Sequence, residues 1–145
     1  MRRLAICMLL VFATAAISVA ADETLDELKS RAQNALPQDR PGLFVQIAQL
    51  QLRNADKFFE AGNVEQAHQA VEEVAVYSEK ARDAATETKK RQKNVEIAVR
   101  KMAEKLKDIK RTISFEDQPP VDHAIERLEA VRTTLLKEMF KKEKK

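Results

Sequence analysis

The sequence predicts an all-α protein whose long amphipathic helices pack as antiparallel hairpins. Charged residues make up 34% of the 145-residue chain, which holds only 2 Gly and 4 Pro, and this composition is typical of long helices and coiled coils. Apolar residues recur at helical spacing, without the alternation of a half-buried strand. The longest periodic segment, residues 64–113, contains neither Gly nor Pro. These observations predict helical hairpins built on one long central helix.

Residues 1–20 are predicted to be a cleaved secretory signal rather than part of the fold. An uncharged apolar run at 4–19 follows two arginines, and Ser18-Val19-Ala20 fits the small-residue cleavage rule. The run is almost long enough to span a membrane, so an uncleaved anchor is the alternative, and this segment would then be the protein's contact with the membrane. Cleavage leaves one helical domain at 21–145, which we expect to be periplasmic or secreted.

Removal of this segment changes both the charge and the cysteine content. The full chain has a formal net charge of +3, and the two arginines of the signal account for most of it. The mature domain is therefore nearly neutral, and long-range attraction to nucleic acid is not expected. Cys7 is the only cysteine and leaves with the signal, so the mature domain has no disulfide, thiolate nucleophile or cysteine metal ligand.

The first two helices are expected at about 24–36 and 40–61. The shorter one begins at a capping box, Thr24-Leu25-Asp26-Glu27. A linker bracketed by two prolines follows, and the second helix carries an apolar face so broad that it needs cover on more than one side. Gly62 ends this helix, because Gly takes the left-handed conformation at a helix C-terminus with little strain. So short a connection forces the next helix to run antiparallel.

A single helix over 64–113 is the preferred prediction for the central element. Most positions on a four-three rhythm from Ala67 to Ile113 are apolar, which places them on one stripe of a helix. A continuous helix of this length would be a rod of roughly 75 Å. Residues 86–94, however, include no apolar side chain. The alternative is a break at 86–94 that closes the chain into a compact four-helix bundle.

The last helix is expected at about 120–141. Pro119 and Pro120 prevent the central helix from continuing past the turn that precedes them. The apolar stripe of the last helix should fold back on the second half of the central helix. The lysines near its C-terminus suit a position where cations meet the negative end of the helix dipole.

The expected hairpin around Gly62 has a characteristic spacing of small, aromatic and branched side chains, at Ala55, Phe58, Gly62, Ala67 and Val71. Over about residues 43–77 this spacing resembles a single tetratricopeptide repeat. The chain holds no second copy and no closing proline, although stacked repeats need neighbours for stability. The resemblance implies a function in protein–protein interaction and carries over no ligand residues.

No catalytic, cofactor or metal site is predicted, so we expect a protein that is not an enzyme. Glu65 and His68 form the Glu-x-x-His spacing of di-iron bundles, but the second copy that such a site needs is absent. His68 lies one step off the apolar stripe and is expected to be exposed beside Glu72. His123 is expected to be solvated, with no Ser or Cys placed beside it as a nucleophile. Two glycines cannot form a Gly-rich phosphate loop.

Two groups of side chains are candidates for binding. Four aromatic residues near the hairpin would form a partner surface if the outer face of the second helix were uncovered: Phe44, Phe58, Phe59 and Tyr77. Four cations within 86–94 could contact lipid headgroups, envelope polysaccharide or an acidic protein: Lys89, Lys90, Arg91 and Lys93. The simpler interpretations are a core position for the aromatic residues and a solvated helix face for the cations.

The predicted function is that of an exported, non-catalytic adaptor or envelope scaffold that acts through protein–protein contacts. Helix stripes wider than one neighbour can cover also suggest self-association. The alternative is a small helical bundle that binds an apolar ligand or a client protein between its helices. The segment 86–94 discriminates between them, because a break allows a closed bundle with an interior and a continuous helix does not.

Overall fold

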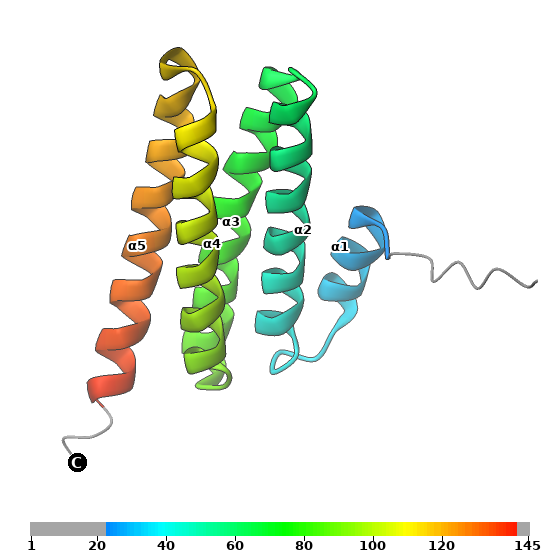
Figure 1. Ribbon diagram of the computed structural model, residues 1–145. Coiled ribbons are helices and arrows are strands. Elements are labelled where there is room, and N and C mark those ends of the chain that lie inside the picture. Colours follow the sequence, from blue (N-terminus) through cyan, green and yellow to red (C-terminus); the bar gives the residue numbers. More distant parts are fainter. Residues whose placement is uncertain (1–22, 142–145) are drawn as a thin grey trace, which may run out of the picture.

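The computed structural model describes residues 23–141, which form five α-helices, one turn of 3-10 helix and no strand (Figure 1). The elements are α1 (Leu25–Asn34), α2 (Arg40–Glu60), α3 (Val64–Thr88), α4 (Gln92–Thr112), η1 (Phe115–Asp117) and α5 (Gln118–Lys141). The predicted all-α class is confirmed. The predicted signal segment at 1–20 lies outside the described residues.

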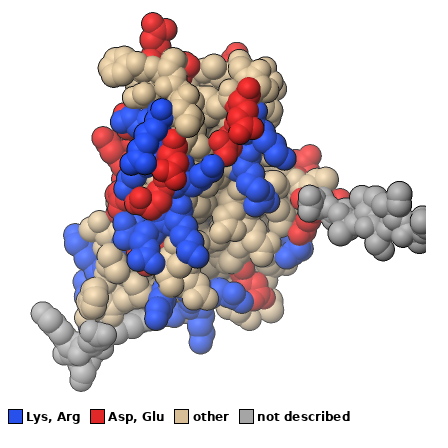
Figure 2. Space-filling view, in the orientation of Figure 1, with Lys and Arg blue, Asp and Glu red and all other residues tan. Residues whose placement is uncertain are grey.

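Helices α2 to α5 lie side by side with alternating direction, and the short α1 packs on the outside of α2 (Figure 1). Helix α3 contacts α2 and α5, and α4 packs against α5. All four long helices contribute fully buried side chains to the core, among them Ile47, Val74, Leu106 and Leu128. Charged side chains of both signs cover the outer face drawn in Figure 2. The architecture is therefore a compact bundle of two antiparallel hairpins.

The predicted single helix over 64–113 is wrong, and the alternative of a break within 86–94 is correct. The chain reverses between α3 and α4, and α4 returns alongside the bundle instead of extending it (Figure 1). Lys89 and Arg91 adopt the left-handed backbone conformation at φ 56° and 60°. These two residues turn the chain without a Gly or a Pro.

Burial explains why the chain reverses here. No apolar side chain lies between Ala85 and Val95, so a helix continued through this segment would bury nothing. Lys89 and Lys93 would also be like charges one helical turn apart, which disfavours a helix. The reversal brings the stripes of α3 and α4 into one core, where each large aliphatic side chain contributes roughly 1.5–3 kcal/mol. That gain exceeds the roughly 1–2 kcal/mol cost of each left-handed residue.

Glycine at the first left-handed position should stabilise the fold. We expect Lys89→Gly to raise the free energy of unfolding by about 0.5–1 kcal/mol, because Gly adopts this conformation without a Cβ clash. Lys101→Gly removes the same charge from an exposed position inside α4 and should lower the free energy of unfolding by about 0.5–1 kcal/mol. Urea unfolding followed by circular dichroism measures both. Equal destabilisation by the two substitutions would indicate that residue 89 is helical.

Candidate functional site

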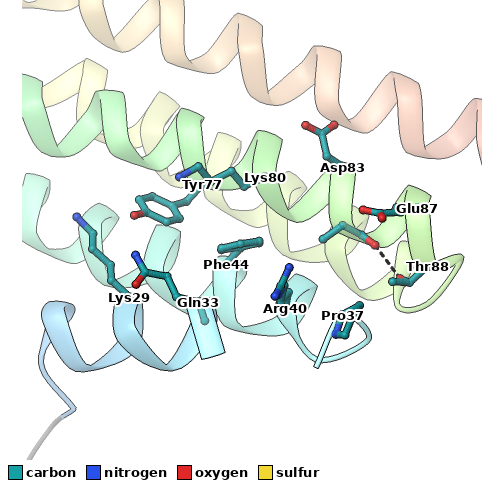
Figure 3. Close-up of a pocket in the computed structure, with 12 residues that line it drawn as sticks. Lys29, Gln33, Pro37, Arg40, Phe44, Tyr77, Lys80, Asp83, Glu87 and Thr88 are labelled. Carbon is teal, nitrogen blue, oxygen red and sulfur yellow. Dashed lines mark hydrogen bonds between the residues drawn. The ribbon is translucent and has the colours of Figure 1, made fainter. Parts of the chain in front are cut away.

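A groove lies between α1 and α3 on the outside of the bundle (Figure 3). Its volume is about 550 Å³, within the range of sites that bind ligands. The lining positions on α3 extend from Tyr77 to Thr88, which is about 16 Å of helix. The groove is therefore long relative to a single side chain.

Helix α1 forms one wall of this groove and is held by a small apolar cluster of its own. Leu28 and Ala32, one helical turn apart, pack against Leu43 and Ile47 of α2. The predicted capping box is present, with the backbone amides of Thr24 and Glu27 each donating to the other's side chain, at 3.0 and 3.3 Å. A helix of 10 residues is marginal alone, so the position of α1 depends on these contacts.

An ion pair also ties α1 to α3. Nζ of Lys29 donates to both carboxylate oxygens of Glu73 at 3.2 and 3.0 Å, and Nε2 of Gln51 donates to the same carboxylate at 2.6 Å. Burial opposes both charges, but the hydrogen bonds and the opposite charge outweigh it. The pKa of Glu73 therefore lies below its ordinary value, and the pKa of Lys29 lies above.

Two half-buried aromatic rings line the groove. The ring centroids of Phe44 and Tyr77 are 6.1 Å apart, and the rings are tilted by 47°. Nζ of Lys29 lies 5.4 Å and Nζ of Lys80 lies 4.6 Å from the centroid of the Tyr77 ring, which is cation–π geometry. The carboxylate of Glu87 lies farther along α3, away from these two cations (Figure 3). The groove thus joins an aromatic surface to charges of opposite sign.

The four aromatic residues of the predicted partner surface separate into two pairs. Phe44 and Tyr77 line the groove, whereas Phe58 and Phe59 lie near the other end of α2, half-buried against the core. The Phe59 ring meets the ring of His68 edge-on, with 5.7 Å between centroids. The aromatic residues therefore do not share one surface.

Sequence reasoning missed the residues that complete the groove on α1 and α3. Lys29 and Gln33 belong to α1, and Lys80 belongs to α3 beside Tyr77. No local pattern marks them, because their proximity depends on how α1 packs across α2. The capping box alone indicated that a helix begins at this point in the chain.

The two histidines lie in different surroundings. His68 was expected to be exposed, but it is half-buried, and its Nε2 donates to the carbonyl oxygen of Asp117 at 3.1 Å. His123 is exposed. Over residues 23–141, no three His, Cys, Asp or Glu side chains are grouped so that they could hold a metal ion. None of the helices in that range is both long and apolar enough to cross a membrane.

The four predicted cations lie in and beside the turn between α3 and α4, and all four are exposed: Lys89, Lys90, Arg91 and Lys93. Nη2 of Arg91 lies 3.9 Å from Oδ1 of Asp39, at the start of α2. The cations therefore occupy one end of the bundle instead of the middle of a long helix.

No family model, curated protein or solved structure matches this chain. The tetratricopeptide resemblance of residues 43–77 stays a prediction.

Protonation of Glu73 should weaken the attachment of α1. Because its pKa is lowered in the folded state, the carboxylate stabilises this attachment above the ordinary pKa of about 4.5, and the contribution is lost as pH falls through the lowered value. The raised pKa of Lys29 means that its contribution is complete below about pH 10.5 and is lost only as pH rises through the raised value. We therefore expect a loss of α1 stability in acid.

Hydrogen-exchange protection factors of residues 25–34 measure this attachment. In the wild type they should fall as the solution is acidified from neutral pH through the titration of Glu73. Glu73→Gln should reduce the protection factors about fivefold or more at neutral pH. The variant should also show no further fall on acidification, because it has no carboxylate at residue 73. Glu104→Gln, which removes an exposed surface pair with Lys107, is the control and should leave α1 unchanged. Unchanged protection in Glu73→Gln would show that the pair does not hold α1.

Proposed function

We propose that this protein is an exported, non-catalytic binding protein that holds a segment of a partner protein in the groove between α1 and α3. The observation that carries the proposal is the groove itself, with its length, its aromatic surface and its charges of both signs. Export to the periplasm or the exterior rests on the sequence of residues 1–20.

The length of the groove favours a peptide segment over a compact ligand. About five extended residues, at roughly 3.3 Å each, would cover the 16 Å of α3 that lines it. Three turns of helix would cover the same length. In either form, one apolar side chain of the segment would rest against Phe44 and Tyr77, whose rings are incompletely buried and can lose further exposed area.

The charges that line the groove indicate what the segment should carry. Lys29 already pairs with Glu73, whereas the ammonium group of Lys80 contacts the Tyr77 ring and forms no ion pair within residues 23–141. A carboxylate of the partner could therefore pair with Lys80. A cation farther along the segment would meet Glu87 (Figure 3). The best-fitting segment has an acidic residue, an apolar anchor and then a basic residue.

The break between α3 and α4 bears on the choice between the two predicted functions. A compact bundle suits a binding module better than an extended scaffold. The alternative of an apolar ligand held between the four helices has less support, because fully buried side chains such as Ile47, Leu106 and Leu135 fill the core. A small ligand would have to use the same outer groove.

Site-specific photo-crosslinking in the native cell tests the proposal. A benzophenone amino acid at Gln33, an exposed residue of the groove, should yield a discrete crosslinked protein. The same probe at Lys101, an exposed residue of α4 that does not line the groove, should not.

Charge reversal within the groove should remove the crosslink. With the probe at Gln33, Lys80→Glu should reduce the adduct about tenfold or more, because it replaces an attraction by a repulsion in a half-enclosed site. Lys101→Glu makes the same charge change outside the groove and should leave the adduct intact. Absence of an adduct, or an equal loss with both substitutions, would count against a partner in the groove. A small molecule found on the purified protein by native mass spectrometry would favour the alternative.

A further inference from the structure

Two basic clusters that are distant in the sequence meet at one end of the bundle. The first comprises Lys89, Lys90, Arg91 and Lys93 around the α3–α4 turn, and the second comprises Lys137 and Lys141 on the last turns of α5. Figure 1 places the α3–α4 turn and the C-terminus of α5 at the same end. We call these six residues the basic end.

The register between α4 and α5 explains this juxtaposition. Nε of Arg132 on α5 lies 3.1 Å from Oε1 of Glu96 on α4. The two helices are antiparallel, so a residue beyond Arg132 lies level with one that precedes Glu96 by a similar distance. Lys137 is consequently level with the start of α4, and Lys141 lies about one helical turn farther along at the same end.

The positive charge of the molecule is concentrated locally rather than in general excess. Residues 23–141 contain equal numbers of basic and acidic residues. At the opposite end, where the α2–α3 and α4–α5 turns lie, charges of both signs are mixed: Glu60, Glu65, Glu116 and Asp117 lie near Lys57, Lys110 and Arg111. On the face drawn in Figure 2, Lys and Arg side chains predominate at the lower end, which is the basic end. The basic end is thus a local concentration of positive charge in a domain whose described residues have no net charge.

Most cations of the basic end form no close ion pair with another helix of the described chain. Lys89, Lys90 and Lys93 are exposed and form no ion pair within the described part of the chain. Arg91 approaches Asp39 only at 3.9 Å, with both side chains about half exposed. Lys141 pairs with Glu138, one helical turn away, at 3.1 Å. The side chains of the basic end are therefore available to an external anion.

Exposed apolar side chains accompany the cations. Phe140 is 59% exposed beside Lys137 and Lys141, and Leu36, in the loop before α2, is 61% exposed. The third large apolar side chain with high exposure in the described chain, Phe115, lies at the opposite end. Lysines around an exposed aromatic ring form the pattern of proteins that bind at the membrane interface.

We propose that the basic end docks on a membrane surface that contains anionic phospholipid. Its cations would contact headgroup phosphates, and Phe140 and Leu36 would enter the boundary between headgroups and acyl chains. The cations are spread over a turn and a helix end instead of converging on a packed centre, as they would at a protein hot spot. This arrangement suits a diffuse negative surface. None of the six cations of the basic end lines the α1–α3 groove.

Vesicle sedimentation tests this docking. The chain that begins at residue 21 includes every described residue and lacks the predicted signal. It should sediment with vesicles of phosphatidylglycerol and phosphatidylcholine, and not with phosphatidylcholine alone. Binding should weaken as salt is raised, because screening shortens the reach of the charges. Absence of binding to the anionic vesicles would overturn the proposal, even if the protein bound a soluble acidic protein.

A matched pair of variants distinguishes the contribution of the basic end to vesicle binding from that of net charge. The first changes Lys89, Lys90, Arg91 and Lys93 to Gln, and the control changes four exposed cations elsewhere to Gln: Arg53, Lys57, Lys101 and Arg111. Both remove four positive charges. The first should weaken vesicle binding by nearly three orders of magnitude, since each cation near an anionic surface strengthens binding roughly fivefold. The control should bind nearly as the wild type does.

Two further readouts complete the test. Circular dichroism and thermal unfolding verify that both variants are folded, so that a loss of binding reports on the surface. Phe140→Ser should weaken the binding that remains at high salt, where the apolar contribution dominates. An equal loss of binding in the two charge variants would overturn the proposal, because net charge alone would then account for the attraction.

Discussion

The reversal of the chain at Lys89–Arg91 is the constraint on which the rest of the structure depends. It returns the apolar stripe of α4 to the stripe of α3 and leaves a place for α5 beside both. The strain of two left-handed residues is tolerated because the apolar side chains of all four long helices are buried in one shared core. The same reversal places four cations at one end of the bundle. In a continuous helix they would lie in the middle of a rod.

Helix α5 fixes the positions of α3 and α4 relative to each other through ion pairs to both helices. Nε and Nη2 of Arg127 donate to the two carboxylate oxygens of Glu79 at 2.8 Å each, and Nη1 donates to Glu72 at 2.6 Å. This bidentate pair lowers the pKa of Glu79 and raises that of Arg127. Arg132 pairs with Glu96 on α4. The pairs join α5 to α3 and α4 in one register, and that register places the C-terminal lysines at the end of the bundle where the α3–α4 turn lies.

Most helix boundaries could be predicted because caps, prolines and Gly62 act within a few residues. The break after α3 could not, because no local breaker marks it and its cause is burial between segments far apart in the sequence. The four-three spacing of buried positions even continues through the break, where the polar side chain of Gln92 keeps the phase and is buried at 6% exposure. The groove escaped prediction for a related reason. The position of α1 depends on packing against α2 and on the long-range pair of Lys29 with Glu73.

A distance measurement across the reversal tests this account most directly. Glu65 and Arg111 are exposed in the first turn of α3 and the last turn of α4, and a chain that begins at residue 21 has no cysteine to interfere with labels at Glu65→Cys and Arg111→Cys. Neighbouring helix axes lie about 10 Å apart, so pulsed electron resonance should give a label distance below about 35 Å. A continuous helix over 64–113 would separate the labels by about 70 Å. A distribution centred near that longer distance would contradict the reversal, and with it the bundle and its basic end.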